Sequence, residues 1–210
     1  MPKKRESIEH RAVTHLAAAD PVMAEIIQRV GPCTMQYREP DFETLARSIV
    51  FQQLSGRSAR AIFDRLKTEL GNGVRLAPEA VANMDADAAR RIGLSGQKMR
   101  YLRDLGVKVQ NGTVDLKHVS RLSDDEVIQE LTKITGVGVW TAQMFLLFAL
   151  RRPDILATGD LGVRTAIRQA YRMRSLPNPK RVERFGKRWQ PYRSIACWYL
   201  WRSLDPSILL

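Results

Sequence analysis

The sequence predicts an all-α protein of two lobes with a cleft between them. Three observations support this fold class across the 210 residues. Alternation of polar and apolar residues with a period of two is absent, apolar residues recur at helical spacing, and helix-capping residues appear throughout. A chain of this length suits one domain or two closely packed lobes and can bury a sizeable core. We expect a single unit over residues 1–210, without internal repeats.

The first expected helix begins after Asp20. Aspartate is a favoured N-cap residue, and Pro21 suits the first helical position because proline has no amide hydrogen to leave unsatisfied. Apolar residues then share one face as far as Gly31, which is typical of a helix end.

Two longer helices are expected next. Asp41 begins the first of them, with an apolar stripe over residues 42–50. Ser55 and Gly56 interrupt that helix and cap the following one, which ends at Gly71. Residues 71–78 read as a turn-rich connection.

Three further helix starts follow at Pro78, Asp85 and Ser95. The first two begin short apolar patterns, and the third begins a longer pattern. Asn111 and Gly112 form a favourable turn pair.

Residues 131–142 predict two helices joined by a tight hairpin. Ser123 and Glu126 form a capping box for the first helix. Gly136 and Gly138 stand between the helices, where a positive φ and close approach to another backbone would both exclude a Cβ atom. The second helix then presents free amides and the positive end of its dipole. This arrangement can grip a phosphate, although an ordinary helix corner has the same pattern.

The chain after the hairpin reads as one core helix, a loop and three helices. Residues 137–150 form the longest apolar run, which is shorter than the ~18–20 residues of a transmembrane helix. A loop over 151–160 follows, and helices are expected from Leu161, Pro179 and Pro191.

Composition indicates an anionic partner. The net charge is +12 and the pI is near 10.2, and nucleic acid fits better than a membrane because no long apolar span or lipid-anchor motif is present. Residues 1–8 begin with charged side chains and no secretory signal, so we expect a flexible arm that either contacts DNA or is simply solvated. The two cysteines favour a reducing compartment and cannot supply the four ligands of an iron–sulfur cluster.

Several motifs in order resemble the helix-hairpin-helix DNA glycosylases with a Gly/Pro-rich loop and a catalytic aspartate, the HhH-GPD superfamily. Within it the chain resembles the 3-methyladenine DNA glycosylase II branch in its compact form. The resemblance covers roughly residues 40 to 204. It rests on Gly136-Val137-Gly138-Val139-Trp140-Thr141-Ala142, on Gly159-Asp160 twenty positions after Trp140, on Arg188-Trp189-Gln190-Pro191-Tyr192-Arg193-Ser194, and on Trp201.

The resemblance implies that Asp160 is the catalytic residue. Cleavage of an N-glycosidic bond builds positive charge on the sugar, and a carboxylate can stabilise that charge or orient and deprotonate the attacking water. An aspartate before a helix is ordinarily an N-cap. The two roles can coexist.

The resemblance also implies a base pocket. Trp140 occupies the hairpin position where bifunctional relatives carry a nucleophilic lysine, so we expect hydrolysis without strand cleavage. Its indole suits a cationic alkylated base, or it is a core residue. Trp201 matches a pocket aromatic of the family. Met144 and Leu161 stand where the best-known members have aromatic residues, which predicts a less aromatic pocket.

DNA contacts are implied for several residues of the predicted helix ends. An enzyme that flips a base must fill the gap in the duplex, and Gln53 is the expected plug, with Leu54 as the alternative wedge. Phosphate contacts are expected from Ser95 and Lys98 at a helix start. Further phosphate contacts are expected from the amides of Gly136, Gly138 and Thr141 and from the side chain of Arg164, with Arg168 one turn further on.

The expected cofactor requirement is small. The hairpin carbonyls of this family often hold a monovalent cation (sodium or potassium), which points to the main-chain oxygens of Thr132, Ile134 and Val137. No redox or organic cofactor and no iron–sulfur cluster is expected.

The sequence therefore predicts a monofunctional DNA-3-methyladenine glycosylase II. It would flip alkylated, cationic purines out of double-stranded DNA and excise them, leaving an abasic site for base excision repair. We expect a monomer without membrane contact, in the bacterial cytoplasm at the nucleoid or in a eukaryotic nucleus. The alternatives are a non-catalytic helix-hairpin-helix DNA-binding module and a glycosylase for other damaged bases.

Overall fold

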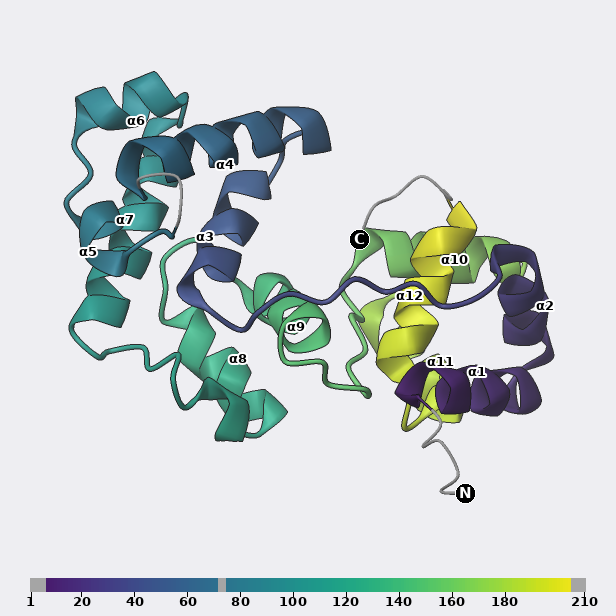
Figure 1. The fold of residues 1–210 in the computed structure, drawn as a ribbon. Coiled ribbons are helices and arrows are strands. Elements are labelled where there is room, and N and C mark those ends of the chain that lie inside the picture. The colour runs from purple at the N-terminus through teal and green to yellow at the C-terminus, as the bar shows by residue number, and fades with distance from the viewer. Residues whose placement is uncertain (1–6, 72–74, 205–210) are drawn as a thin grey trace, which may run out of the picture. The chain divides into compact units, whose positions relative to one another are not determined.

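In a computed structural model, residues 7–71 and 75–204 are described, and every regular element in these ranges is a helix (Figure 1). The α-helices are α1 (Ile8–Ala19), α2 (Pro21–Val30), α3 (Phe42–Phe51), α4 (Gly56–Leu70), α5 (Pro78–Ala82), α6 (Ala86–Ile92), α7 (Gly96–Gln110), α8 (Asp124–Thr132), α9 (Val139–Phe148), α10 (Leu161–Ala170), α11 (Pro179–Gly186) and α12 (Arg193–Leu204). The 3₁₀ helices are η1 (Val119–Arg121) and η2 (Lys187–Trp189). The all-α prediction is confirmed. No helix in the described ranges combines the length and apolar character needed to cross a membrane.

The chain divides into two compact units. Unit 2 is the continuous stretch Arg38–Leu150 and contains α3 to α9. Unit 1 takes its chain from the segment ending at Tyr37 and from the segment starting at Arg151, so it contains α1, α2 and α10 to α12.

The predicted capping residues set most helix boundaries. Side chains that accept a hydrogen bond from an amide of the first helical turn are found at Asp20, Asp41, Ser55, Asp85, Ser95 and Ser123, and Glu126 completes the capping box of α8. Because these bonds satisfy amides that have no partner within the helix, each cap fixes where its helix begins.

Three sequence expectations need correction. The arm expected over residues 1–8 is wrong at its end, because the Ser7 hydroxyl accepts from the His10 amide and α1 already starts at Ile8; the rest of the expected arm lies outside the described residues. Helix α1 itself was not expected, since only Ala12 and Leu16 of its side chains are buried.

The last helix begins at Arg193 and not at Pro191, because η2 precedes it. Part of the connection expected over 71–78 also lies outside the described residues.

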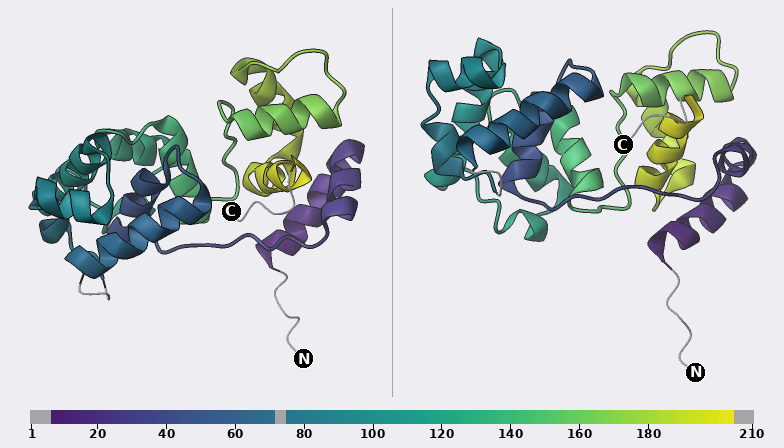
Figure 2. Two further views of the ribbon diagram at one scale, coloured as in Figure 1. Left: turned by 90° about the horizontal axis from the view of Figure 1, so that it is seen from above. Right: turned by 45° about the horizontal axis from the view of Figure 1, so that its top comes forward.

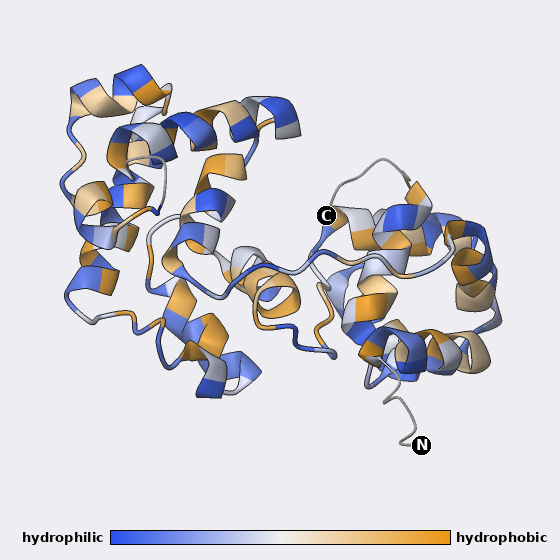
Figure 3. Ribbon diagram, viewed as in Figure 1, coloured by the Kyte–Doolittle hydropathy of each residue, from blue (hydrophilic) through white to orange (hydrophobic). Residues whose placement is uncertain are grey.

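The core of unit 2 follows the apolar stripes. In α3 the predicted stripe is buried, including Leu45 and Ile49. Helix α9 is apolar over most of its length (Figure 3), and Ala142, Phe145 and Leu146 are buried. This confirms the prediction of a core helix after the hairpin.

The core of unit 1 is built around α12. All residues from Ser194 to Trp201 are buried, since α12 packs against α1, α2 and α10 (Figure 2). A buried carboxylate joins the two chain segments of this unit. Asp20 caps α2 and also accepts hydrogen bonds from the Tyr171 hydroxyl at 2.6 Å and from Trp189 Nε1 at 3.0 Å. Burial and the bond to Asp20 both raise the pKa of Tyr171.

Candidate functional site

The hairpin turn between α8 and α9 requires a glycine at position 136. Gly136 has φ +87°, and a Cβ atom there would lie 2.2 Å from the Tyr101 ring. Both the left-handed backbone and the ring of α7 therefore exclude a side chain. The predicted glycine requirement is confirmed here, although the close neighbour is an aromatic ring rather than another backbone.

Gly138 differs from Gly136, and the expectation for it is wrong. Its φ is −94°, and no atom lies within 4 Å of a Cβ built at this position. Nothing within the described residues therefore demands glycine. Gly138 is the N-cap of α9 and supplies no side-chain hydrogen bond to the helix. The first intrahelical bond runs from the Ala142 amide to the Gly138 carbonyl, so the amides of Gly138 and Val139 have no partner within the helix.

Helix α7 holds the hairpin turn in place. The Asp104 carboxylate accepts from the Thr135 amide at 2.7 Å and pairs with Lys108 at 2.8 Å. Lys108 Nζ also donates to the Lys133 carbonyl at 2.5 Å. Burial acts to raise the pKa of Asp104, but the hydrogen bonds from Lys108 and Thr135 outweigh it and lower this pKa. Sequence reasoning missed this support, because its partners stand 25 to 31 positions apart.

The turn between α3 and α4 carries the predicted plug residues. Gln53 is exposed and has φ +57°, which is uncommon for a residue with a side chain. Leu54 is 39% exposed, so its side chain is available to a partner. Gln52 Nε2 donates to the Gly136 carbonyl at 2.9 Å, which ties this turn directly to the hairpin. The structure therefore brings the predicted plug and the predicted phosphate grip together within unit 2.

Lys98 has a different contact from the one predicted. Its Nζ donates to the carbonyl oxygens of Val50 at 2.5 Å and Gln52 at 2.7 Å, where it stabilises the C-terminal end of α3. Burial lowers the pKa of Lys98. Ser95 is the N-cap of α7 and accepts from the Lys98 amide. Both predicted phosphate ligands thus have structural contacts within unit 2.

The remaining hairpin residues differ in exposure. Trp140 is 48% exposed, so the alternative of a core tryptophan is wrong. Val139 is 54% exposed beside it. Thr141 is buried and Met144 is half-buried on the same helix. The start of α9 therefore presents an apolar surface next to its amides.

In unit 1 the Asp160 carboxylate lies at the start of α10. Its Oδ1 accepts from the Val163 amide at 2.7 Å, which confirms the N-cap role. The same oxygen accepts from Trp201 Nε1 at 2.7 Å. Trp201 is 6% exposed, so its indole is a buried donor that orients the carboxylate. Two donors on one oxygen fix the position of this acid, as catalysis at a developing positive charge would require.

Gly162 makes the contact between Trp201 and Asp160 sterically possible. A Cβ atom at position 162 would lie 2.9 Å from Trp201 Cδ1 and 3.1 Å from Asp160 Oδ1. Any side chain there would displace the indole or the carboxylate. This glycine stands two positions after Asp160, but its role depends on Trp201, 39 positions further along the chain.

The loop before Asp160 is held by the Arg193-Ser194 pair. Arg193 forms a bidentate ion pair with Asp154, with Nε to Oδ1 at 2.7 Å and Nη2 to Oδ2 at 2.9 Å. The buried Ser194 hydroxyl donates to the Arg152 carbonyl at 2.6 Å and accepts from the Ile155 amide at 2.9 Å. The motif from Arg188 to Ser194 therefore positions the loop that leads to Asp160, a role that sequence reasoning did not assign.

Leu161 and Arg164, the predicted pocket residue and phosphate contact beside Asp160, have contrasting environments. Leu161 is 65% exposed directly after the carboxylate, as expected for a pocket wall. Arg164 is not directed only to solvent, because its Nε donates to the Pro177 carbonyl at 2.8 Å and secures the segment before α11. Its predicted phosphate contact is therefore not supported, whereas Arg168 is exposed one turn further on.

The described residues contain no cluster of three or more His, Cys, Asp or Glu side chains that could hold a metal ion. Both cysteines are free thiols. Burial raises the pKa of Cys33 to about 11 and that of Cys197 to about 12, so neither is a nucleophile at neutral pH. Neither cysteine therefore competes with Asp160 as the candidate catalytic group.

These features define a class of protein: an all-helical fold with a helix-hairpin-helix turn and an aspartate that starts the next helix. The chain belongs to the HhH-GPD superfamily of base excision DNA repair proteins, whose family model matches residues 46–191.

Individual relatives cover nearly the whole chain. The DNA-3-methyladenine glycosylase 1 of Schizosaccharomyces pombe is 33% identical over 92% of this chain and 86% of its own length. The solved structure of S. pombe 3-methyladenine DNA glycosylase Mag1 in complex with abasic DNA has a TM-score of 0.81 and 34% identity over 91% of this chain and 95% of that chain. A DNA-3-methyladenine glycosidase from Bacillus halodurans has a TM-score of 0.80 and 33% identity, covering 95% of this chain and 90% of that one.

Proposed function

We propose that this chain is a monofunctional DNA-3-methyladenine glycosylase. It hydrolyses the N-glycosidic bond of alkylated, cationic purines in double-stranded DNA and leaves an abasic site. The observation that carries this proposal is the Asp160 carboxylate, which lies within the matched family region and accepts hydrogen bonds from the Val163 amide and the Trp201 indole. The names of the relatives support the substrate class.

Asp160 acts on the sugar in this proposal. As the bond to the base breaks, positive charge develops on the sugar, and the fixed carboxylate stabilises it and orients the attacking water. A cationic base is already a good leaving group, so the barrier to be lowered is modest. Leu161, exposed directly after Asp160, and the half-buried Met144 of α9 keep the pocket role that the family resemblance implies, with an aliphatic side chain at each position. The choice of the damaged base then rests on the shape of the pocket and on the weakened stacking of that base in the duplex.

The exposed turn after α3 opens the duplex in this proposal. Gln53 fills the gap that a flipped base leaves, and Leu54 is the alternative wedge. Their exposure supports the role, as does the bond from Gln52 to Gly136 that fixes the turn to the hairpin. Trp140 offers no amine for a Schiff base, so the product strand stays uncut.

The amides at the start of α9 take the DNA phosphate. The open space around Gly138 and the absence of a side-chain cap support this role. Thr141 contributes through its amide only, because its side chain is buried. Ser95 contributes the N-terminus of α7, while Lys98 keeps its contacts with the end of α3.

A monovalent cation in the hairpin is part of the proposal. The Ile134 carbonyl accepts from the Val137 amide at 3.0 Å but keeps a second lone pair. Within the described ranges no main-chain donor reaches the carbonyl oxygens of Thr132 or Val137, which supports a role in binding an ion. Replacing sodium and potassium by tetramethylammonium at constant ionic strength should then weaken DNA binding.

We further propose that the chain acts as a monomer on chromosomal DNA, in bacterial cytoplasm or in a eukaryotic nucleus. Relatives from bacteria and yeast support the association with DNA repair. Sedimentation of the free protein tests the monomer.

The test is release of free base from methylated duplex DNA. Wild type should release 3-methyladenine, with strand breaks only after alkali. Asp160→Asn should lower the rate by about 10²–10⁴-fold while DNA binding is retained. Asp125→Asn, which removes an exposed carboxylate on α8, is the matched control and should keep full activity. Tight DNA binding without base release by wild type would favour the non-catalytic module. Release of oxidised or mismatched bases instead would assign another glycosylase specificity.

A further inference from the structure

A basic surface lies on α11 and η2. It contains none of the residues proposed for catalysis. The stretch Pro179–Trp189 contains five basic side chains and one acidic one, Glu183. Its net charge of +4 is a third of the net charge of +12 of the whole chain. We call this surface the α11 basic surface. It consists of Lys180, Arg181, Arg184, Lys187 and Arg188, all of which are exposed.

These cations have few partners of opposite charge. Across the described ranges no carboxylate forms an ion pair with Lys180, Arg181, Arg184 or Lys187. Arg188 lies 3.8 Å from the buried Asp20, which already accepts several other hydrogen bonds. Elsewhere in the chain basic residues such as Arg193 and Arg91 have close acidic partners. Like charges one helical turn apart repel each other, so an external anion would stabilise this arrangement.

The α11 basic surface is also rigidly built. A groove of about 500 Å³ is lined by Arg181, Arg184, Phe185 and Arg188. The Arg188 guanidinium stacks on the Phe185 ring at 4.3 Å, and that ring packs edge-on against Tyr171 at 4.3 Å.

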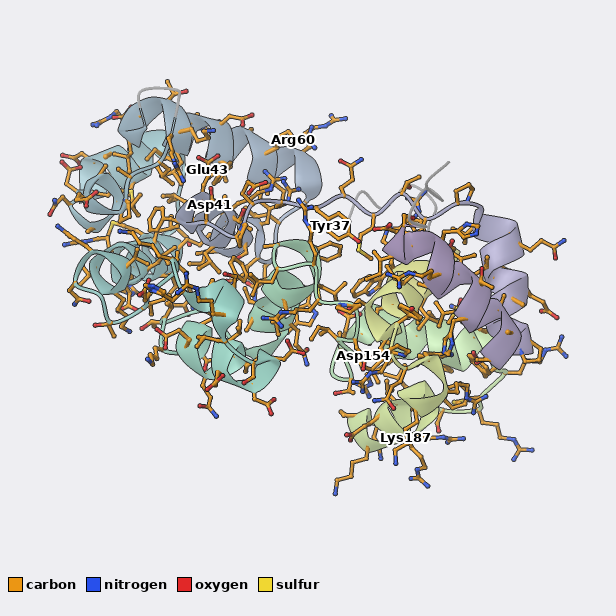
Figure 4. All side chains as sticks on the ribbon, turned by 60° about the horizontal axis from the view of Figure 1, so that its bottom comes forward. Tyr37, Asp41, Glu43, Arg60, Asp154 and Lys187 are labelled. Atoms are coloured by element: carbon orange, nitrogen blue, oxygen red, sulfur yellow. The ribbon has the colours of Figure 1, made fainter. Side chains whose placement is uncertain are left out.

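The inner face of α11 is fixed as well. A Cβ atom at Gly186 would lie 2.5 Å from Leu156, so α11 packs closely on the loop that leads to Asp160. Figure 4 shows Lys187 at the edge of unit 1, where side chains ending in nitrogen project away from the ribbon. The groove is therefore preformed, with its floor in the core of the unit.

We infer that the α11 basic surface binds the phosphate backbone of duplex DNA as a second contact, separate from the hairpin. The inference rests on the proposed DNA substrate. Arginine forks bind phosphate oxygens in a bidentate manner. Two other partner classes fit worse. Large exposed apolar side chains are found at Leu54, Val107, Val139, Trp140 and Leu161, none of them on this surface, so it lacks the apolar anchors of a protein interface or of a membrane-bound helix.

The experiment compares charge-neutralising double variants on undamaged DNA. The probe is a 40-base-pair duplex with a fluorescent end, titrated between about 50 and 200 mM salt. Arg181→Gln with Arg184→Gln should weaken binding at least tenfold and lower the slope of log K against log salt by about two, since each phosphate contact contributes about 0.9. Lys117→Gln with Arg121→Gln removes the same charge from exposed positions before α8 and should change the affinity less than twofold. Arg181→Lys with Arg184→Lys should restore most of the slope.

A second readout separates this inference from the proposed enzyme activity. At saturating protein, base release from a 12-base-pair methylated duplex should stay within twofold of wild type in the Arg181→Gln, Arg184→Gln variant. Absence of base release by wild type would contradict the proposed function alone, because the binding comparison needs no catalysis. Equal losses of DNA affinity in the Arg181→Gln, Arg184→Gln variant and the Lys117→Gln, Arg121→Gln variant would overturn the inference. An unchanged salt slope in the first variant would overturn it too. If the first variant has a lowered melting temperature, Lys180→Gln with Lys187→Gln on the same α11 basic surface must reproduce the loss of slope, and failure to do so overturns the inference as well.

Discussion

The helices α9 and α10 begin in opposite ways, although each follows an irregular segment of a compact unit. Helix α9 starts at Gly138, which gives no side-chain hydrogen bond and leaves open space around the first amides. Helix α10 starts at Asp160, whose carboxylate accepts from its own Val163 amide. One helix start therefore keeps its positive end for a ligand, while the other already has an internal anion.

In the proposed mechanism the same backbone feature, a helix N-terminus, serves two purposes: the one at α9 binds a phosphate and the one at α10 holds the catalytic group. At α9 the groups proposed to bind phosphate are main-chain amides. Glycine suits the N-cap position because it has no side chain to cover these amides. At α10 the useful group is the capping carboxylate itself, and the helix amide and Trp201 fix its position. The supports differ accordingly. Helix α7 braces the hairpin turn, whereas Arg193 and Ser194 brace the loop before Asp160.

Among the variants that test the contrast between α9 and α10, Gly136→Ala should have the largest effect on stability and DNA binding. The new Cβ would lie 2.2 Å from the Tyr101 ring at φ +87°. Strain in the left-handed region and overpacking together should destabilise unit 2 by about 3 kcal/mol and abolish DNA binding. Thermal denaturation and anisotropy measure the two effects. A stable variant with normal binding would show that the turn can rearrange.

Ser194→Ala should have the next largest effect, on the α10 side. It leaves the buried Ile155 amide and Arg152 carbonyl without the hydroxyl that joins them, at a cost of about 1–3 kcal/mol. Because the loop leads to Asp160, base release should fall more than DNA affinity. Ser203→Ala, which removes a hydroxyl bonded only within α12, is the control. Equal effects of the two variants would contradict a role in positioning the loop.

Gly138→Asp makes the start of α9 resemble that of α10. An aspartate fits the extended backbone of this N-cap, so stability should rise by a few tenths of a kcal/mol, about the difference between glycine and a capping side chain. DNA affinity should fall at least about tenfold, because the carboxylate occupies the amides and repels phosphate. Gly138→Ala adds a Cβ without a charge and should weaken binding less. Unchanged affinity in the aspartate variant would show that phosphate does not bind there.

The smallest effect expected is that of Asp104→Asn on the support of the hairpin. The folded pKa of Asp104 is lowered, so its contribution to stability is complete above the ordinary value of 3.8 and is lost as the pH falls through the lower folded value. Wild type should exceed the variant by about 1 kcal/mol at pH 7, and this difference should close below pH 3.8. Melting temperatures across this range measure it. A difference that grows in acid would contradict the assigned bonds.

The sequence was sufficient for the all-α class and for most helix starts, but not for α1 or for most of the contacts that hold the candidate site residues. Caps such as Asp20, Asp41 and Ser55 are local signals, because the side chain bonds to an amide two or three residues away. Asp160 was predicted from its place in a motif, twenty positions after Trp140, which can be read directly from the sequence. The need for glycine at position 162 was not predicted, since it depends on the packing of Trp201.

The contacts that the sequence did not reveal share one physical cause. Lys98 and Arg164 stand at helix positions that suit phosphate contacts, yet their side chains donate to carbonyl oxygens 46 to 48 and 13 positions away, respectively. A long flexible cation can reach many partners, and only the tertiary fold decides among them. Helix α1 was missed for a related reason, because its two buried residues, Ala12 and Leu16, give too weak an apolar stripe.

The order of the units along the chain has a consequence for synthesis. All residues of unit 2 have been made once Leu150 has left the ribosome, and its hairpin contacts lie within this stretch. Unit 1 needs α12, because the bond from Trp201 to Asp160 and the loop contacts of Ser194 come from that helix. Since domains generally fold as units, N-terminal first, during synthesis, we expect the hairpin contacts to form before the Asp160 carboxylate is held in place. A truncated product ending before α12 would therefore contain the whole of unit 2 but would lack the Trp201 and Ser194 contacts that hold Asp160 and its loop.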